Sequence, residues 1–123
     1  MTRRLLCVAA LALSLAGGPA AAEYVAMPGA VLQGLDKITA RVTELVMPNG
    51  QIHTFGGLIV RVSACYRRPP EEPPEAAAFV EIGDAKTNPA TLLFRGWMFA
   101  SSPAVSPFQH PVYDVRVLRC ITG

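Results

Sequence analysis

The sequence predicts an all-β fold, a small antiparallel sandwich or barrel of about six or seven strands that follows a cleaved signal peptide. Short segments with alternating apolar and polar residues recur at regular spacing along the chain. Glycine, proline and asparagine separate these segments, and no segment repeats apolar residues with the period of an amphipathic helix. This combination is typical of small sandwiches and barrels.

Residues 1–22 are predicted to be a secretion signal. Arg3 and Arg4 precede an apolar stretch over residues 5–16, which is too short to span a bilayer. Three alanines before Glu23 form a small-residue cleavage site. The sequence therefore predicts a periplasmic protein that is cut before Glu23 and has no membrane span in its mature form.

The mature chain is expected to carry no net charge. The full sequence has 11 lysines and arginines against 9 aspartates and glutamates, and removal of the signal takes away two arginines. A neutral domain has no overall electrostatic attraction to nucleic acid or to anionic membranes. Nucleic acid is therefore not expected as a partner.

Residues 23–35 are predicted to be a flexible lead-in, because two glycines closely flank its apolar cluster. A single β domain is expected over residues 36–123, since a chain of this length builds one core. Alternation predicts its first strand over residues 38–43. The sequence Pro-Asn-Gly at residues 48–50 then predicts a tight turn, followed by a short return strand over residues 51–55.

Residues 58–66 form the clearest predicted strand, whose alternation places Val62 on one face and Cys65 on the other. The next segment, residues 67–75, contains four prolines and three glutamates. Prolines favour an extended polyproline II conformation, so this proline-glutamate segment is predicted to be a stiff surface connection.

Three further strands complete the predicted domain, over residues 78–82, 91–99 and 112–120. Gly96 interrupts the second of them, which predicts a β-bulge or a close backbone approach there.

Cys65 and Cys120 are the two cysteines that remain after signal removal. In an oxidising compartment two cysteines of a small domain commonly pair, and the bridge would contribute about 4 kcal/mol. The alternative is a pair of buried free thiols. A disulfide would require the ends of two distant strands to meet.

Two regions are candidates for binding. The proline-glutamate segment is either a docking surface or a solvated connector, and its candidate residues are Arg67, Arg68, Glu71, Glu72 and Glu75. The aromatic residues Trp97 and Phe108 either form an exposed platform, which would stack on sugars or anchor a partner, or fill the core.

A catalytic alternative uses Ser102, His110 and Asp114 as nucleophile, base and orienting acid. No Gly-x-Ser-x-Gly elbow supports it, and serines near prolines are ordinary loop residues. The two histidines lack the spacing of metal ligands, so neither a metal nor another cofactor is expected.

Residues 34–41, 64–75 and 96–104, together with 110–115, resemble domain-of-unknown-function family 2155. The run Gly-Trp-Met-Phe-Ala-Ser-Ser-Pro is the most distinctive part besides the proline-glutamate segment. The family comprises small exported proteins of Gram-negative bacteria, so the resemblance implies a periplasmic location. It implies no activity and transfers no residue role.

These observations together predict a non-catalytic periplasmic β-domain that binds an envelope protein or a cell-wall component. The alternatives are a small envelope hydrolase that uses the Ser/His/Asp set, and a purely structural envelope protein.

Overall fold

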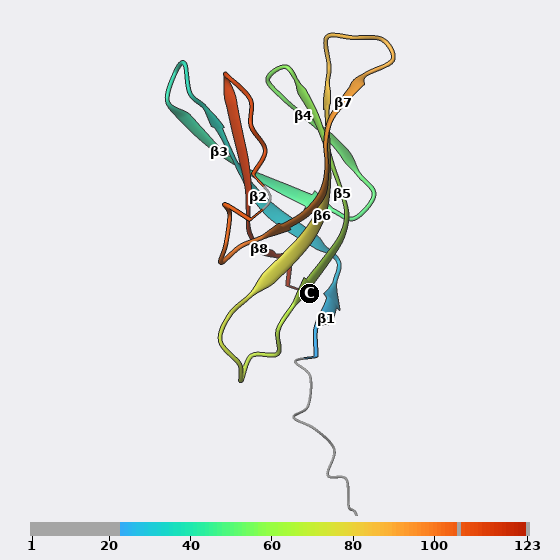
Figure 1. Cartoon of the computed structure of the whole chain (residues 1–123). Helices are drawn as coiled ribbons and strands as arrows, with labels where there is room; N and C mark the ends of the chain where they lie inside the picture. The colour runs from blue at the N-terminus through green and yellow to red at the C-terminus, as the bar shows by residue number, and fades with distance from the viewer. Residues whose placement is uncertain (1–22, 106, 123) are drawn as a thin grey trace, which may run out of the picture.

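A computed structural model of the protein describes residues 23–105 and 107–122. The predicted signal at residues 1–22 lies outside the described residues. The all-β prediction is confirmed, since eight strands in two antiparallel sheets make up the described chain (Figure 1). In chain order the strands are β1 (Val25–Met27), β2 (Gly29–Asp36), β3 (Arg41–Pro48), β4 (Ile52–Phe55), β5 (Leu58–Arg67), β6 (Ala76–Asp84), β7 (Thr91–Phe99) and β8 (Tyr113–Cys120).

The larger sheet has the order β1-β5-β6-β7, with β4 also paired to β5, and the smaller sheet has the order β3-β2-β8. Their inner faces pack together, so the fold is a sandwich whose core lies between the sheets. The largest fully buried side chains come from both layers: Leu32, Met47, Leu58, Ile82, Val60, Val62, Val80 and Cys65. Among the described residues, no helix has the length and apolar character needed to cross a membrane.

The prediction of a flexible lead-in over residues 23–35 is wrong. Most of this segment belongs to β1 and β2, and β2 is the central strand of the smaller sheet. Ala30, Val31 and Leu32 are all buried. β2 pairs with β3 on one edge and with β8 on the other, and these neighbours shield even Val31, which lies outside the core cluster. Its sequence therefore shows an apolar run in place of clear alternation.

The predicted strand over residues 38–43 is also corrected. Residues 37–40 form the turn between β2 and β3, in which Ile38 is 74% exposed and Ala40 has a positive φ of 61°. The strand begins only at Arg41. Asp36 stabilises the turn, because its side chain accepts hydrogen bonds from the backbone N–H groups of Ile38 and Thr39.

The remaining predicted strands are confirmed as β4, β5, β6, β7 and β8, and the predicted turn before β4 has Gly50 at a φ of 86°. Neither the bulge nor the close backbone approach predicted at Gly96 is found, since Gly96 pairs regularly with Val80 and only the Phe94 ring lies within 4 Å of an added Cβ. The irregularity in that pair of strands lies instead beside Ile82 and Gly83.

Two bulges orient the cysteines. The pairing of β5 with β6 shifts between Val62 and Ala64, and the pairing of β8 with β2 shifts beside Leu118. Each bulge inserts one extra residue, which moves the next cysteine onto the inner face. Cys65 and Cys120 are therefore both buried, although simple alternation places Cys65 on the face opposite Val62.

Candidate functional site

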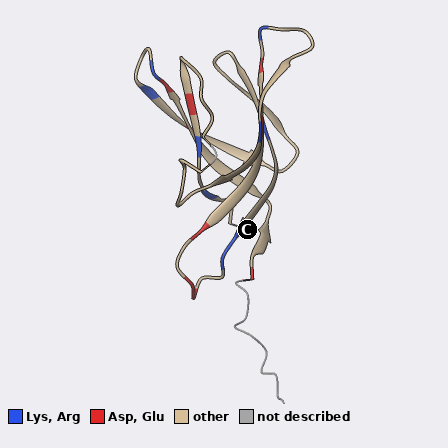
Figure 2. Cartoon of the chain, in the orientation of Figure 1, with Lys and Arg blue, Asp and Glu red and all other residues tan. Residues whose placement is uncertain are grey.

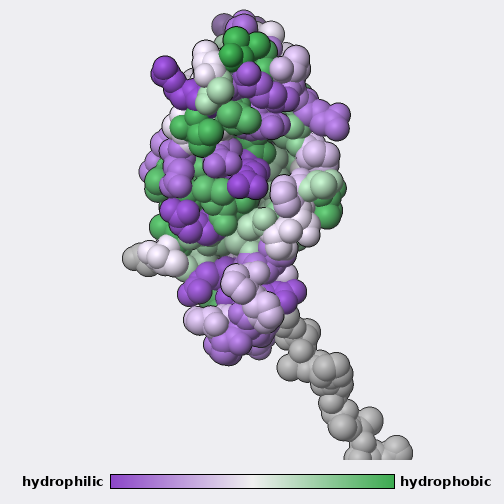
Figure 3. All heavy atoms as spheres, turned by 90° about the vertical axis from the view of Figure 1, so that its left-hand side faces the viewer, coloured by the Kyte–Doolittle hydropathy of each residue, from purple (hydrophilic) through white to green (hydrophobic). Residues whose placement is uncertain are grey.

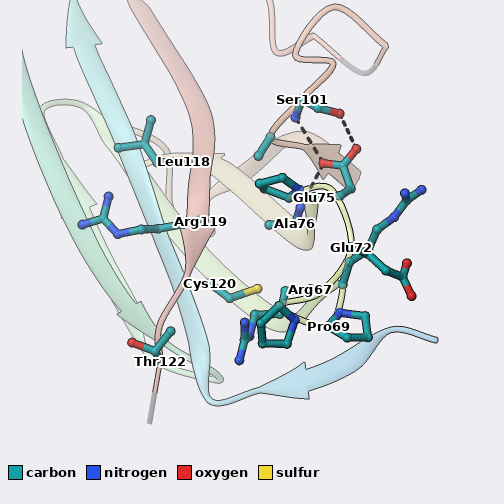
Figure 4. A pocket seen from close by; sticks show the side chains of 14 residues that line it. Arg67, Pro69, Glu72, Glu75, Ala76, Ser101, Leu118, Arg119, Cys120 and Thr122 are labelled. Atoms are coloured by element: carbon teal, nitrogen blue, oxygen red, sulfur yellow. Dashed lines mark hydrogen bonds between the residues drawn. The ribbon is translucent and has the colours of Figure 1, made fainter. Parts of the chain in front are cut away.

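A cleft of about 480 Å³ lies between the proline-glutamate segment and the end of β8 (Figure 4). The segment contributes Arg67, Arg68, Pro69, Pro70, Glu72, Pro74 and Glu75 to its lining, and β8 with the residues after it contributes Leu118, Arg119, Cys120 and Thr122. Ala76, Ala100 and Ser101 complete the lining. Prolines and small apolar residues thus make up much of the wall.

The proline-glutamate segment projects from one end of the sandwich as the loop between β5 and β6. Charged residues of both signs gather there, as Figure 2 shows. Seen from the side of β3, the hydrophilic lower end of the molecule contrasts with the more hydrophobic middle (Figure 3). The cleft therefore combines apolar walls with a charged rim.

Glu75 joins two parts of the cleft wall. Its carboxylate accepts a hydrogen bond from the Ser101 hydroxyl. It also accepts hydrogen bonds from the backbone N–H of Ser101 at 3.1 Å and from that of Ala76 at 2.9 Å. The backbone N–H of Ala100 donates to the carbonyl oxygen of Ala76 at 2.9 Å. These bonds tie the loop after β7 to the base of the proline-glutamate segment.

The same contacts set the pKa of Glu75. Partial burial raises the pKa of its carboxyl, but the hydrogen bonds from Ser101 and Ala76 and the positive charge of Arg68 outweigh burial, so the pKa is lowered. The bonds to Ser101 and Ala76 are charge-assisted, which makes them stronger than neutral hydrogen bonds.

Replacement Glu75→Gln is expected to reduce the free energy of unfolding by about 1 kcal/mol at pH 7, because charge-assisted hydrogen bonds to a partly exposed group are lost. A lowered folded-state pKa gives stability that is present above the unfolded-state pKa and is lost as pH falls through the folded-state value. Urea unfolding at pH 7 and below pH 4 should therefore show the difference shrinking in acid. Glu71→Gln, at an exposed position of the same segment, is the control, and an equal loss there would contradict the role of Glu75.

The disulfide lies at the wall of the cleft. Cys65 and Cys120 are bonded, with their Cα atoms 5.8 Å apart, which confirms the predicted pairing. Cys120 lines the cleft, and Cys65 lies two residues before Arg67, where the proline-glutamate segment begins. The bridge therefore links the start of the segment covalently to β8.

The two arginines that begin the segment have different surroundings. The Arg67 Nε donates to the Met27 sulfur of β1 at 3.4 Å. The Arg68 guanidinium lies 5.9 Å from the centre of the Tyr24 ring, within cation–π range. The Arg68 Nε is out of contact with solvent and has no hydrogen-bond partner among the described residues.

The structure brings together most of the predicted binding residues of the segment but separates them from the two aromatics. Arg67, Arg68, Glu72 and Glu75 line the cleft, whereas Glu71 does not. Trp97 is 39% exposed on the outer face of the larger sheet, where its ring packs against Phe79 and Tyr66 with centroid distances of 5.4 and 6.0 Å.

Phe108 belongs to the core, with only 6% of its surface exposed. Its ring packs against Phe94 and His110, with centroid distances of 6.2 and 5.8 Å. Phe108 therefore fills the core, which was one of the two predictions for the aromatic residues. It does not form an exposed platform together with Trp97.

The residues of the catalytic alternative make other contacts. The His110 Nδ1 accepts the backbone N–H groups of Val112 and Tyr113 at 3.0 and 3.3 Å, and Asp114 forms an ion pair with Lys37 at 3.8 Å. Among the described residues, no hydrogen bond joins Ser102, His110 and Asp114 to one another. Residues 23–105 and 107–122 contain no group of three or more His, Cys, Asp or Glu side chains that could hold a metal ion.

The predicted disulfide placed the start of the proline-glutamate segment at the last strand, as the structure confirms, but sequence reasoning missed the cleft between them and missed Ser101 as the partner of Glu75. The predicted disulfide carried the necessary signal. A bond between Cys65 and Cys120 places whatever follows Cys65 beside the end of β8, and the proline-glutamate segment follows it two residues later.

The fold and the site define a small antiparallel β-sandwich with one disulfide and a proline-walled cleft. The chain belongs to the family described as an uncharacterised protein conserved in bacteria (DUF2155), which matches residues 30–120. It is also similar to an uncharacterised protein of Rickettsia prowazekii (strain Madrid E), with 29% identity over 100 residues. That match covers 80% of this chain but 64% of the relative, so the chain spans less than two thirds of the relative's length. No solved structure matches the chain.

Proposed function

We propose that this chain is an exported, non-catalytic binding domain of the bacterial cell envelope, and that it holds its partner in the proline-walled cleft. The partner is an envelope protein or a cell-wall component. The observation that carries the proposal is the cleft itself, which joins apolar walls to a charged rim. Pockets of this kind, mainly apolar with a few polar groups, are typical binding sites.

Rigidity supports a binding role for the cleft. The disulfide holds one side of it to β8, and the hydrogen bonds of Glu75 hold the other side to the loop after β7. Prolines restrict the backbone between these two attachments. A surface that is ordered before binding loses little conformational entropy when a partner arrives.

The charged residues on the rim of the cleft are suited to polar contacts with a partner. Arg68 contributes a positive charge to the rim, and its guanidinium lies over the Tyr24 ring. Glu72 on the same rim offers the opposite charge.

Site-specific photocrosslinking in living Gram-negative cells tests the proposal. The full chain is produced with a photoreactive phenylalanine analogue at Pro70, an exposed position in the cleft wall. We expect the chain in the periplasmic extract to begin at Glu23 and to form a discrete adduct after irradiation. Recovery of the adduct with soluble protein or with insoluble cell wall identifies the class of partner.

The matched control carries the same analogue at Leu92, which is 57% exposed. Leu92 lies at the start of β7, whereas the cleft residue Ala100 follows the end of that strand. The proposal fails if Pro70 gives no adduct, or if both positions give the same adducts. A chain that stays in the cytoplasm with residues 1–22 intact would also contradict it.

A further inference from the structure

The outer face of the larger sheet carries a second surface, which the proposed function does not use. We propose that this face binds an acidic polysaccharide, one of whose sugar rings stacks on Trp97 while a sugar carboxylate pairs with Arg95. Neither residue lines the proline-walled cleft, so the two surfaces are separate. The proposal therefore goes beyond the proposed function and can fail without it.

The pairing of β6 with β7 places aromatic and charged side chains side by side on this face. Phe79 pairs with Trp97, and Glu81 pairs with Arg95. The intervening Val80 of β6 is buried in the core, as is Met98 of β7, so these four side chains point outward. Residues two apart in a strand are roughly 7 Å from one another, and a sugar ring with its carboxylate spans a similar distance.

Three aromatic rings form the apolar half of the surface. Tyr66 of β5, the strand on the other side of β6, is 37% exposed, and Trp97 is exposed to a similar extent. The Phe79 ring meets the Trp97 ring edge to face, which holds the indole in place. Apolar residues exposed singly are normal on a protein surface, whereas a cluster of them is typical of a binding surface.

A row of three charged residues forms the polar half. The Glu81 carboxylate lies 3.6 Å from the Arg61 Nη1 and 3.3 Å from the Arg95 Nε, so the row carries one net positive charge. The two arginine side chains are 47% and 62% exposed, and each guanidinium has five N–H donors. The Arg95 guanidinium also lies 5.8 Å from the centre of the Phe79 ring, directly beside the aromatic cluster.

The two halves match the two sides of an acidic sugar. A pyranose ring presents C–H groups that stack on an aromatic face, and its hydroxyl groups can donate to the Glu81 carboxylate. A sugar carboxylate would accept charge-assisted hydrogen bonds from Arg95, which a neutral sugar cannot do. The Tyr66 ring lies 6.0 Å from the Trp97 ring between centroids and offers a second stacking position, which favours a chain of sugars.

A protein partner fits this surface less well. The centre of a protein interface is depleted of charged residues, and a stable one buries about 800 Å² on each side. Here the ion-pair row adjoins the rings on one side, and exposed Ile52 pairs with Arg61 at its far end. The charges therefore lie in the middle of the exposed face, where a glycan can use them.

Fluorescence tests the proposal directly, because Trp97 is the only tryptophan of the chain. The mature chain is titrated with a hexamer of galacturonic acid, with a hexamer of hyaluronan, and with maltohexaose, which has no carboxylate. We expect a saturable change in Trp97 emission with an acidic hexamer, and an affinity for maltohexaose that is lower by about fivefold or more.

Three variants identify the contacts by isothermal titration calorimetry. Arg95→Gln is expected to weaken binding of the acidic hexamer about fivefold, and Trp97→Ala about tenfold. Trp97→Phe keeps a ring and should lose less than Trp97→Ala, provided that both unfold at a similar urea concentration. Arg41→Gln is the matched control, since it removes the same charge from an exposed position at the start of β3 in the other sheet. It should change the affinity less than twofold.

The outcomes separate this proposal from the cleft. Equal affinities for all three hexamers, or no binding of either acidic one, would overturn it. An equal loss in Arg41→Gln and Arg95→Gln would also overturn it, because the attraction would then be diffuse. A protein adduct formed through a photoreactive analogue at Trp97, without any hexamer binding, would show a protein interface instead. Trp97→Ala should leave the Pro70 adduct unchanged, and loss of that adduct would show that the two surfaces are one site.

Discussion

Replacing both Cys65 and Cys120 by alanine is expected to lower the free energy of unfolding by about 4 kcal/mol. The bond spans 55 residues of sequence, and its loss returns this loop's conformational freedom to the unfolded chain. Domains of this size have a total stability of about 5–15 kcal/mol, so the variant is expected to be marginal. Urea unfolding of the mature chain, followed by tryptophan fluorescence of Trp97, measures the difference.

Reduction provides the matched control for this prediction. The unaltered chain in excess dithiothreitol should unfold at nearly the same urea concentration as the double variant, because both lack the bridge. Both cysteines are buried, so alanine also removes some packing, and the variant should be slightly the less stable of the two. A double variant within about 1 kcal/mol of the oxidised chain would contradict the loop-entropy argument.

The substitution Gly29→Ala is expected to have the second large effect, a loss of about 3 kcal/mol in the free energy of unfolding. Gly29 begins β2, and an added Cβ would overlap the carbonyl oxygen of Met47 and lie 2.7 Å from the Cα of Pro48. Both are backbone atoms of the paired strand β3, which cannot turn aside as a side chain can. The substitution must therefore move one strand away from the other.

Gly96→Ala is the control for Gly29→Ala. Gly96 also lies within a strand, but the nearest atom to an added Cβ belongs to the Phe94 ring at 3.6 Å, an ordinary contact. We expect Gly96→Ala to change the free energy of unfolding by no more than about 0.5 kcal/mol. Equal effects at the two glycines in urea unfolding would show that loss of glycine, and not the contact with β3, determines the result.

The sequence predicted well the strands whose two faces differ in environment. In β5, Val60 and Val62 face the core while Arg61 faces solvent, so alternation is visible in the residues themselves. The strand β2 gave no such signal, because it is central and pairs on both edges. The turn at residues 37–40 was read as strand because chance alternation of Ile38 and Ala40 mimics the strand pattern.

The site was predicted in part, for a physical reason. Residues on one continuous segment, such as Arg67 and Glu72, can be grouped from sequence because the chain itself keeps them together. The wall from β8 comes from distant sequence, and only the pairing of Cys65 with Cys120 connects the two. Phe108 was grouped wrongly with Trp97, since composition does not tell which side of a sheet a loop aromatic occupies.

The two bulges have a consequence for how this chain can vary in length. Successive residues of a strand point to opposite faces. Each bulge reverses this alternation once, between Val62 and Cys65 and between Val117 and Cys120. Deletion of one residue at either bulge would leave a regular two-residue step, which keeps the thiol on the inner face because strand residues two apart share a face. These two steps are therefore positions inside strands where the chain can lose one residue and keep the bridge. Straightening of a bulge without a change in length would instead turn the thiol outward, out of reach of its partner.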